Sequence, residues 1–137
     1  MLKNELKLTK RERELIKKRK LSSRSKGELA IMKFLGENGI EFIDEFYFKE
    51  MRRLGKLKLL FFDFYIPSYR LAIEFDGIQH YTKEFKGKKM PHSEENDFMK
   101  NAFCKKNKIE LLRIKYDQID NVETIIFEKF DKISPNV

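Results

Sequence analysis

A chain of 137 residues with 41% hydrophobic and 38% charged residues suits one domain with one apolar core under a charged surface. The net charge of +8 favours a phosphate-rich partner, although a lysine-rich surface kept for solubility would give the same value. A single cysteine, Cys104, excludes a disulfide within the chain, and no apolar run approaches the roughly 18 residues of a membrane span. With no apolar signal-peptide stretch either, we expect a soluble, intracellular protein.

The N-terminal segment, residues 1–22, is expected to be a basic helix or arm. Residues 1–26 contain eleven Lys or Arg against three Glu. A helix is predicted over residues 8–20, with Thr9 as its cap. Because this helix has few apolar side chains, it either packs weakly on the core or reaches toward a partner.

Residues 23–137 are expected to form a single domain. Its predicted elements are a helix from Ser25 to about Gly36, a strand at 40–48, an exposed basic turn or hairpin at 49–58, a strand at 59–66, a tight turn at 67–70, a strand at 71–75, a polar loop at 82–92, a helix at 93–106, a strand at 109–116 and a helix at 122–133. The class is α/β or α+β, with a central mixed β-sheet flanked by helices.

Two of these strands define the predicted sheet. The nearly all-apolar run at 71–75 indicates a central strand. The helix at 93–106 connects it to the strand at 109–116, which predicts a crossover and a parallel pair. The inner face of that helix is assigned either to Phe98, Ala102 and Phe103 or to Met99 and Phe103. Within the helix, Cys104 is expected to be a half-buried thiol.

Three carboxylates interrupt the most apolar predicted strands. Asp63 stands in the first of them, and Glu74 and Asp76 punctuate the next. Because an unpaired buried carboxylate is strongly unfavourable, they need compensation. Ion pairs with Lys or Arg would supply it, and a solvent-facing side of the strand suits Glu74 and Asp76, which share parity. The functional explanation is a site for a hard cation such as Mg²⁺.

Local geometry favours the metal site. The turn at 67–70 makes the two strands a hairpin, and adjacent strands lie about 4.8 Å apart, so Asp63 and Glu74 can converge. A cation held there would lower the pKa of a water molecule and offset charge on a scissile phosphate. His80 could act as general base or phosphate donor, and Gln79 could orient a water.

The residues around this hairpin resemble a known family. Asp63-Phe64-Tyr65-Ile66-Pro67, followed by Ile73-Glu74-Phe75-Asp76-Gly77-Ile78-Gln79-His80, is similar to the PD-(D/E)XK nuclease superfamily. More narrowly, it resembles the branch of very-short-patch repair endonucleases and phage EDxHD homing endonucleases. The resemblance continues in Ser25-Lys26-Gly27-Glu28, Asn96-Asp97-Phe98-Met99-Lys100-Asn101 and Leu111-Leu112-Arg113-Ile114, and implies a restriction-endonuclease-like core.

The resemblance also implies roles for the acidic residues. Asp63 becomes the principal metal ligand and Glu74 the second acidic residue of the site. Asp76, also assigned to the metal, stands where the superfamily usually has a lysine. The branch pattern implies that His80 and Gln79 substitute for that lysine.

Two acidic residues lie outside the hairpin. The resemblance implies that Glu28 holds a metal-bound water, whereas a capping box alone would also explain a Glu at this position. Asp97 would orient His80, whereas an acidic residue in the first helical turn is also favoured by the helix dipole.

The implied activity is Mg²⁺-dependent hydrolysis of double-stranded DNA, with Mn²⁺ able to substitute, by a homing or mobile-element type of endonuclease in a bacterial or phage-infected cell. A mismatch nickase, a junction-resolving nuclease and a catalytically silent DNA-binding relative are the alternatives. Because no separate DNA-reading module is recognisable, either specificity resides in the core domain, or the chain is one member of a homodimer, or partners supply it. The candidate DNA contacts, any of which can instead be a solvated charge, are Lys10, Arg11, Arg13, Lys17, Lys18, Arg19, Lys20, Lys26, Lys83 and Lys100.

Overall fold

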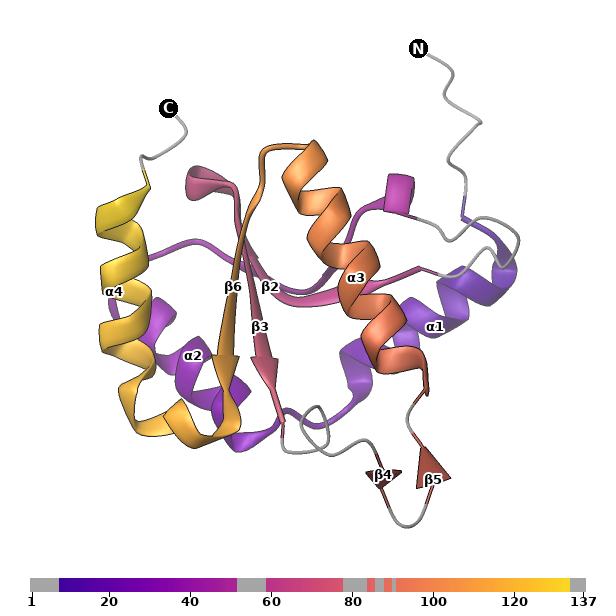
Figure 1. Cartoon of the computed structure of the whole chain (residues 1–137), viewed down its shortest axis with the longest axis horizontal. Helices are drawn as coiled ribbons and strands as arrows, with labels where there is room; N and C mark the ends of the chain where they lie inside the picture. Colours follow the sequence, from indigo (N-terminus) through magenta and orange to yellow (C-terminus); the bar gives the residue numbers. More distant parts are fainter. Residues whose placement is uncertain (1–7, 52–58, 78–83, 86–87, 90, 134–137) are drawn as a thin grey trace.

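A four-stranded mixed sheet forms the centre of the molecule, with helices on both of its faces (Figure 1). This computed structural model describes residues 8–51, 59–77, 84–85, 88–89 and 91–133. The helices are α1 (Lys10–Leu21), α2 (Lys26–Glu37), α3 (Pro91–Lys106) and α4 (Val122–Lys132). The central strands are β1 (Ile43–Tyr47), β2 (Phe61–Ile66), β3 (Leu71–Asp76) and β6 (Glu110–Lys115), whereas β4 (Glu84–Phe85) and β5 (Lys88–Lys89) form a separate two-stranded sheet.

The strand order β1-β2-β3-β6 confirms the predicted α+β class with a mixed sheet. β1 pairs antiparallel with β2, and β2 pairs antiparallel with β3. β3 pairs in parallel with β6 after the connection through α3, as the apolar run and the intervening helix predicted. β3 is therefore central, and both of its faces are covered.

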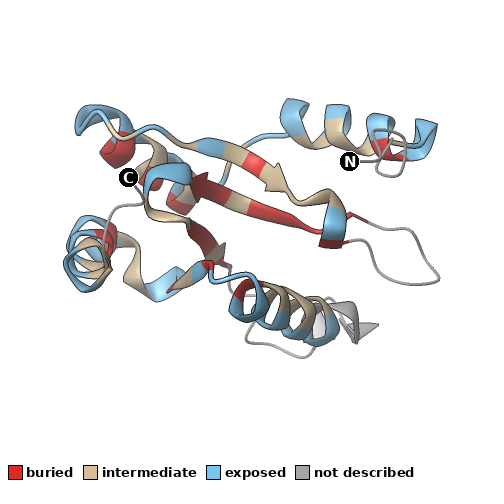
Figure 2. Cartoon of the chain, turned by 90° about the horizontal axis from the view of Figure 1, so that it is seen from above, coloured by how far each residue is buried: buried red, intermediate tan, exposed pale blue. Residues whose placement is uncertain are grey.

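Each face of the sheet carries its own apolar cluster. On one face, α2 and α4 contribute Ile31, Phe34 and Ile126, which pack against strand residues such as Phe64 and Ile73. On the other face, α3 contributes Cys104, which packs with residues such as Phe62 and Ala72. Figure 2 shows the buried residues gathered along the central strands, with the exposed ones on the outer sides of the helices.

Short-range signals fixed the starts of the first two helices. Thr9 caps α1 and Ser25 caps α2, each with a glutamate three residues on that completes a capping box. The hairpin turn between β2 and β3 is a single 3₁₀ turn (Pro67–Tyr69). It ends at Arg70 in the left-handed conformation (φ 49°), whose N–H donates to the Pro67 carbonyl at 3.1 Å. This turn sets the register that brings Asp63 and Glu74 face to face.

Some predictions about the second half of the domain were wrong in detail. α3 begins at Pro91 rather than residue 93. Of the two assignments for its inner face, the one with Met99 and Phe103 is confirmed, whereas Phe98 is 71% exposed. Successive helical residues differ by about 100° in direction, so the one-residue choice between Phe98 and Met99 decides which face is buried. The predicted polar loop at 82–92 contains the short strands β4 and β5.

Three further expectations concern burial and membranes. Cys104 is only 1% exposed, and therefore fully rather than half buried. Residues 49–51 of the predicted basic turn form a 3₁₀ turn whose Met51 is buried, and residues 52–58 lie outside the described residues. Among the described residues, no helix is both long and apolar enough to cross a membrane.

Candidate active site

One charged residue on each central strand lies at the same level of the sheet. In the antiparallel pairing of β1 with β2, Asp44 faces Phe64 and Phe46 faces Phe62. Glu45 therefore lies opposite Asp63. The register of β2 and β3, in which Phe64 faces Ile73, sets Asp63 opposite Glu74. On the other side of β3, Glu74 pairs with Arg113 of β6. Three acidic residues and one cation thus form a row across the sheet, because residues that face each other on neighbouring strands are close neighbours.

Asp63 and Glu74 each bind the other strand through a carboxylate. The backbone N–H of Asp63 donates to Oε2 of Glu74 at 3.0 Å, and the N–H of Phe75 donates to Oδ2 of Asp63 at 2.7 Å. The backbone pairing of β2 with β3 ends at Phe64 and Ile73. Just beyond it, these two bonds to carboxylates satisfy the backbone N–H groups of Asp63 and Phe75. Both carboxylates are therefore held in fixed positions where β2 and β3 part.

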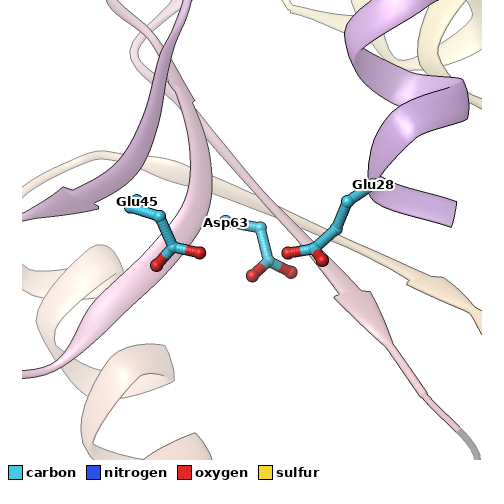
Figure 3. Close-up of side chains that lie close together, drawn as sticks. All are labelled: Glu28, Glu45 and Asp63. Carbon is cyan, nitrogen blue, oxygen red and sulfur yellow. The ribbon is translucent and has the colours of Figure 1, made fainter. Parts of the chain in front are cut away.

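Glu28 of α2 and Glu45 of β1 complete a group around Asp63. One carboxylate oxygen from each of the three residues lies within 4.8 Å of the other two. Figure 3 shows Glu28 and Glu45 on either side of Asp63, with the three carboxylates directed toward a common space. Glu28 also accepts the Ser25 N–H at 2.8 Å, so the capping interpretation of this residue is confirmed and does not exclude a functional one.

Glu45 is a member of the group that the sequence interpretation missed. It is 6% exposed and adopts a positive φ of 48°, which is uncommon for a residue other than glycine. Its Oε2 accepts from Nε of Arg19 in α1 at 2.8 Å. The only sequence signal was the polar pair Asp44-Glu45 inside an apolar strand, which breaks the alternation of a half-buried strand.

The close approach of α2 to the sheet depends on Gly27. A Cβ atom at this position would lie 2.2 Å from Cζ of the Phe75 ring. Gly27 directly precedes Glu28, and Phe75 is the residue whose N–H binds Asp63. The absence of a side chain at Gly27 therefore lets the first turn of α2 bring Glu28 next to Asp63.

The electrostatics of the group favour a bound positive charge. Burial raises the pKa of Asp63 well above its ordinary value, and the charges of Glu74 and Glu28 raise it further, while the Phe75 N–H opposes them. A bound cation would relieve the repulsion that Glu74 and Glu28 exert on Asp63, as a proton does. Its donors are carboxylate oxygens, which are the ligands that Mg²⁺ and Ca²⁺ prefer, so these residues fit such an ion.

A largely buried lysine accompanies the acidic row. Nζ of Lys100 in α3 contacts Oε1 of Glu74, and the lysine side chain is 12% exposed. The same ammonium group lies 5.3 Å from the centre of the Phe62 ring. A lysine thus lies beside the site on a helix, whereas Asp76 occupies the strand position where the superfamily usually has a lysine.

Asp76 and Asp97 both contact a second basic side chain, that of Arg113. Arg113 of β6 lies 3.5 Å from Oδ1 of Asp76 and 3.3 Å from Oδ1 of Asp97. It also donates to Asn101 of α3 at 3.4 Å. The buried Asp76 therefore has a cationic partner, as the ion-pair interpretation anticipated, and belongs to an arginine-centred cluster beside Glu74.

The predicted site residues thus divide into three groups. Asp63 lies with Glu28 and Glu45 around a possible cation position, and Glu74 adjoins them through its bond to Asp63. Two others, Asp76 and Asp97, contact Arg113. The remaining two, Gln79 and His80, lie outside the described residues.

The candidate DNA contacts also differ in their surroundings. Most of them are exposed, whereas Arg19 and Lys100 are engaged with Glu45 and Glu74. Lys83 lies outside the described residues. The exposed candidates are Lys10, Arg11, Arg13, Lys17, Lys18 and Lys20 on α1, and Lys26 at the start of α2.

Comparison with known proteins gives no relative for this arrangement. No family model, no curated protein and no solved structure matches the chain.

Proposed function

We propose that this chain is a metal-dependent DNA endonuclease of the PD-(D/E)XK superfamily, on the very-short-patch and EDxHD branch, with a restriction-endonuclease-like core. The observation that carries the proposal is the convergence of Glu28, Glu45 and Asp63 from one helix and two strands. A fixed group of carboxylates beside a largely buried lysine suits the hydrolysis of a phosphodiester, which needs both a cation and a positive group near the phosphate.

The proposed cation is Mg²⁺, with Mn²⁺ as a substitute. Asp63 would hold it together with Glu28 and Glu45, and Glu74 would support Asp63 from the neighbouring strand. When bound, the ion would lower the pKa of a water molecule and offset negative charge on the scissile phosphate. Phe75 contributes through its N–H, which orients the Asp63 carboxylate.

Individual residues of the chain would then have separate roles in the hydrolysis. A water oxygen forms a bond to phosphorus while the bond from phosphorus to the 3′ oxygen breaks. His80, through the role that the resemblance implies, accepts the proton of the attacking water, and the departing oxygen takes a proton from solvent. Lys100, held beside Glu74, supplies positive charge near the phosphate. Asp97, in the N-terminal half of α3, contacts Arg113.

The proposed substrate is double-stranded DNA in a bacterial or phage-infected cell. A homing or mobile-element role is the form of the proposal that the resemblance favours, and a homodimer would allow both strands of a palindromic site to be cut. A mismatch nickase or junction-resolving enzyme would use the same residues and would give a nick or a resolved junction as its product.

Plasmid cleavage tests the proposal. Supercoiled DNA is incubated with the protein and Mg²⁺ or Mn²⁺, and nicked and linear products are separated on gels. Asp63→Asn is expected to lower the rate roughly 100-fold or more, since it removes the central ligand. Glu128→Gln, an exposed carboxylate on α4, is the matched control. A wild-type protein that binds DNA without cutting it under any metal would instead indicate a silent relative.

A further inference from the structure

The outer side of α1 carries a continuous stripe of positive charge. Lys10, Arg13, Lys17 and Lys20 follow one another at intervals of three or four residues and are all exposed. That spacing places them along one side of an α-helix. We call these four residues the basic stripe. Glu14, also exposed, is the one acidic residue on the outer side of the helix.

The inner side of α1 is fastened to the core by polar contacts. Arg19 binds Glu45 and lies 4.4 Å from the centre of the Phe61 ring. Glu12 is 3% exposed. Just beyond the helix, Arg24 binds Asp44. Figures 1 and 2 show α1 at the side of the molecule opposite α4. The helix is thus attached next to the carboxylate group while its basic stripe faces solvent.

The basic stripe is unfavourable for the isolated protein. Like charges three or four residues apart on a helix destabilise it by a few tenths of a kcal/mol per pair. Positive side chains in the first turn also oppose the helix dipole, and Lys10 and Arg13 both lie there, whereas Lys20 lies in the last turn, where the dipole favours a cation. An extended polyanion would relieve both effects at once.

The dimensions of the basic stripe suit a nucleic-acid duplex. From Lys10 to Lys20 the helix rises about 15 Å at roughly 1.5 Å per residue. Duplex DNA carries about one negative charge for every 1.7 Å of its axis, so several phosphates lie within that length. Lysine and arginine on one helix side can contact such phosphates without reading the base sequence.

We propose that α1 is a DNA-backbone clamp: its basic stripe binds the phosphates of duplex DNA, and Arg19 fastens the clamp to the carboxylate group through Glu45. This inference rests on the proposed function and specifies how its substrate is held. Because Glu45 lies beside Asp63, the helix that would bind the duplex is itself attached next to the proposed cation position. The clamp contributes affinity that does not depend on the sequence of the DNA.

Equilibrium binding at a series of salt concentrations tests the clamp. A fluorescent DNA duplex is titrated in EDTA, so that the proposed cation plays no part. The stripe variant combines Lys10→Gln, Arg13→Gln, Lys17→Gln and Lys20→Gln, which keep good helix formers. Losing four phosphate contacts should reduce the slope of log K against log salt by about 3.6. Between 50 and 200 mM salt, wild-type affinity should therefore fall about 150-fold more than that of the variant.

The control changes the same net charge elsewhere. It combines Lys33→Gln, Lys105→Gln, Lys106→Gln and Lys132→Gln, all exposed and helical. Circular dichroism establishes that both variants are folded. Equal salt slopes for the stripe and control variants would overturn the clamp. So would a stripe variant that loses only its binding to anionic phosphatidylglycerol vesicles, because α1 would then serve a membrane surface.

The failure of the clamp can be told apart from the failure of the proposed function. Asp63→Asn lies outside α1 and should bind DNA in EDTA with the wild-type salt slope, even though it does not cut. A protein that cuts DNA but whose stripe variant binds normally refutes the clamp alone. A protein that binds through the basic stripe but never cuts refutes the nuclease proposal alone.

Discussion

The backbone N–H of Asp63 donates a 3.0 Å hydrogen bond to the carboxylate of Glu74, the residue that faces it on the next strand. Two ionised carboxylates so close repel each other. Lys100 offsets part of this repulsion at Glu74, and the Phe75 N–H offsets part of it at Asp63. Burial is the largest cause that raises the pKa of Asp63, and the repulsion that is not offset raises it further.

This raised pKa predicts how stability changes with pH in the absence of a cation. Asp63 binds its proton more tightly in the folded protein than in the unfolded one. The stability it contributes is therefore fully present below the ordinary carboxyl pKa of about 4, and it is lost as the pH rises through the raised folded pKa. Urea unfolding in EDTA across this range should show wild-type stability falling relative to Asp63→Asn, which has no proton to lose.

Two observations check this prediction further. Mg²⁺ should raise the stability of the wild type at pH 7 and leave Asp63→Asn nearly unchanged, because only a cation bound to the folded state stabilises it. A constant difference in stability between wild type and Asp63→Asn at every pH would show that the Asp63 pKa is ordinary.

The contact between Gly27 and Phe75 makes a second prediction. Gly27→Ala places a Cβ atom where the Phe75 ring lies, 2.2 Å from its Cζ atom, so the ring or the helix must move. We expect a loss of about 1–3 kcal/mol in the free energy of unfolding, the usual range for overpacking. Gly27→Ala with Phe75→Leu should recover part of it. Chemical denaturation measures both, and a neutral Gly27→Ala would contradict the close packing of α2.

The burial of Cys104 makes a third prediction. The thiol is 1% exposed, and burial raises its pKa to about 11. Because the thiolate is the reactive form, native protein at pH 8 should react with a disulfide reagent far more slowly than protein in urea. Rapid labelling of the native protein would contradict the packing of α3 on the sheet.

Local signals made much of the fold predictable from the sequence. Capping boxes at Thr9 and Ser25 depend on residues three positions apart, and the hairpin of β2 and β3 depends on a turn between two apolar runs. Asp63 and Glu74 could be paired in advance for the same reason. Phe98 and Met99 stayed open as alternatives because both fit a helical period and only the neighbouring sheet decides between them.

The rest of the candidate site depends on contacts between distant segments. Glu45 joins Asp63 because β1 pairs with β2 and because α1 delivers Arg19 to its carboxylate. Lys100 reaches Glu74 from a helix that follows in the chain, so a motif that looks for lysine near the strand residue misses it. No periodicity records such contacts, since each depends on tertiary packing.

The pair of Lys100 and Glu74 makes the final prediction. Both side chains are largely buried, at 12% and 7% exposed, so removing one partner leaves the other charge without compensation. Lys100→Met should therefore lower the free energy of unfolding by roughly 3 kcal/mol. Lys100→Met with Glu74→Gln should recover much of that loss, because glutamine can still accept the Asp63 N–H and brings no charge.

A double-mutant cycle measures the coupling, and a surface pair serves as its control. Lys129 and Glu110 lie 2.7 Å apart, but Glu110 is 50% exposed, so their coupling should stay below about 1 kcal/mol. The coupling of Lys100 with Glu74 should exceed it. If Lys100 also supplies charge to the phosphate, the double variant will cut DNA more slowly than Glu74→Gln alone. Equal cleavage by these two variants would leave Lys100 with a structural role alone.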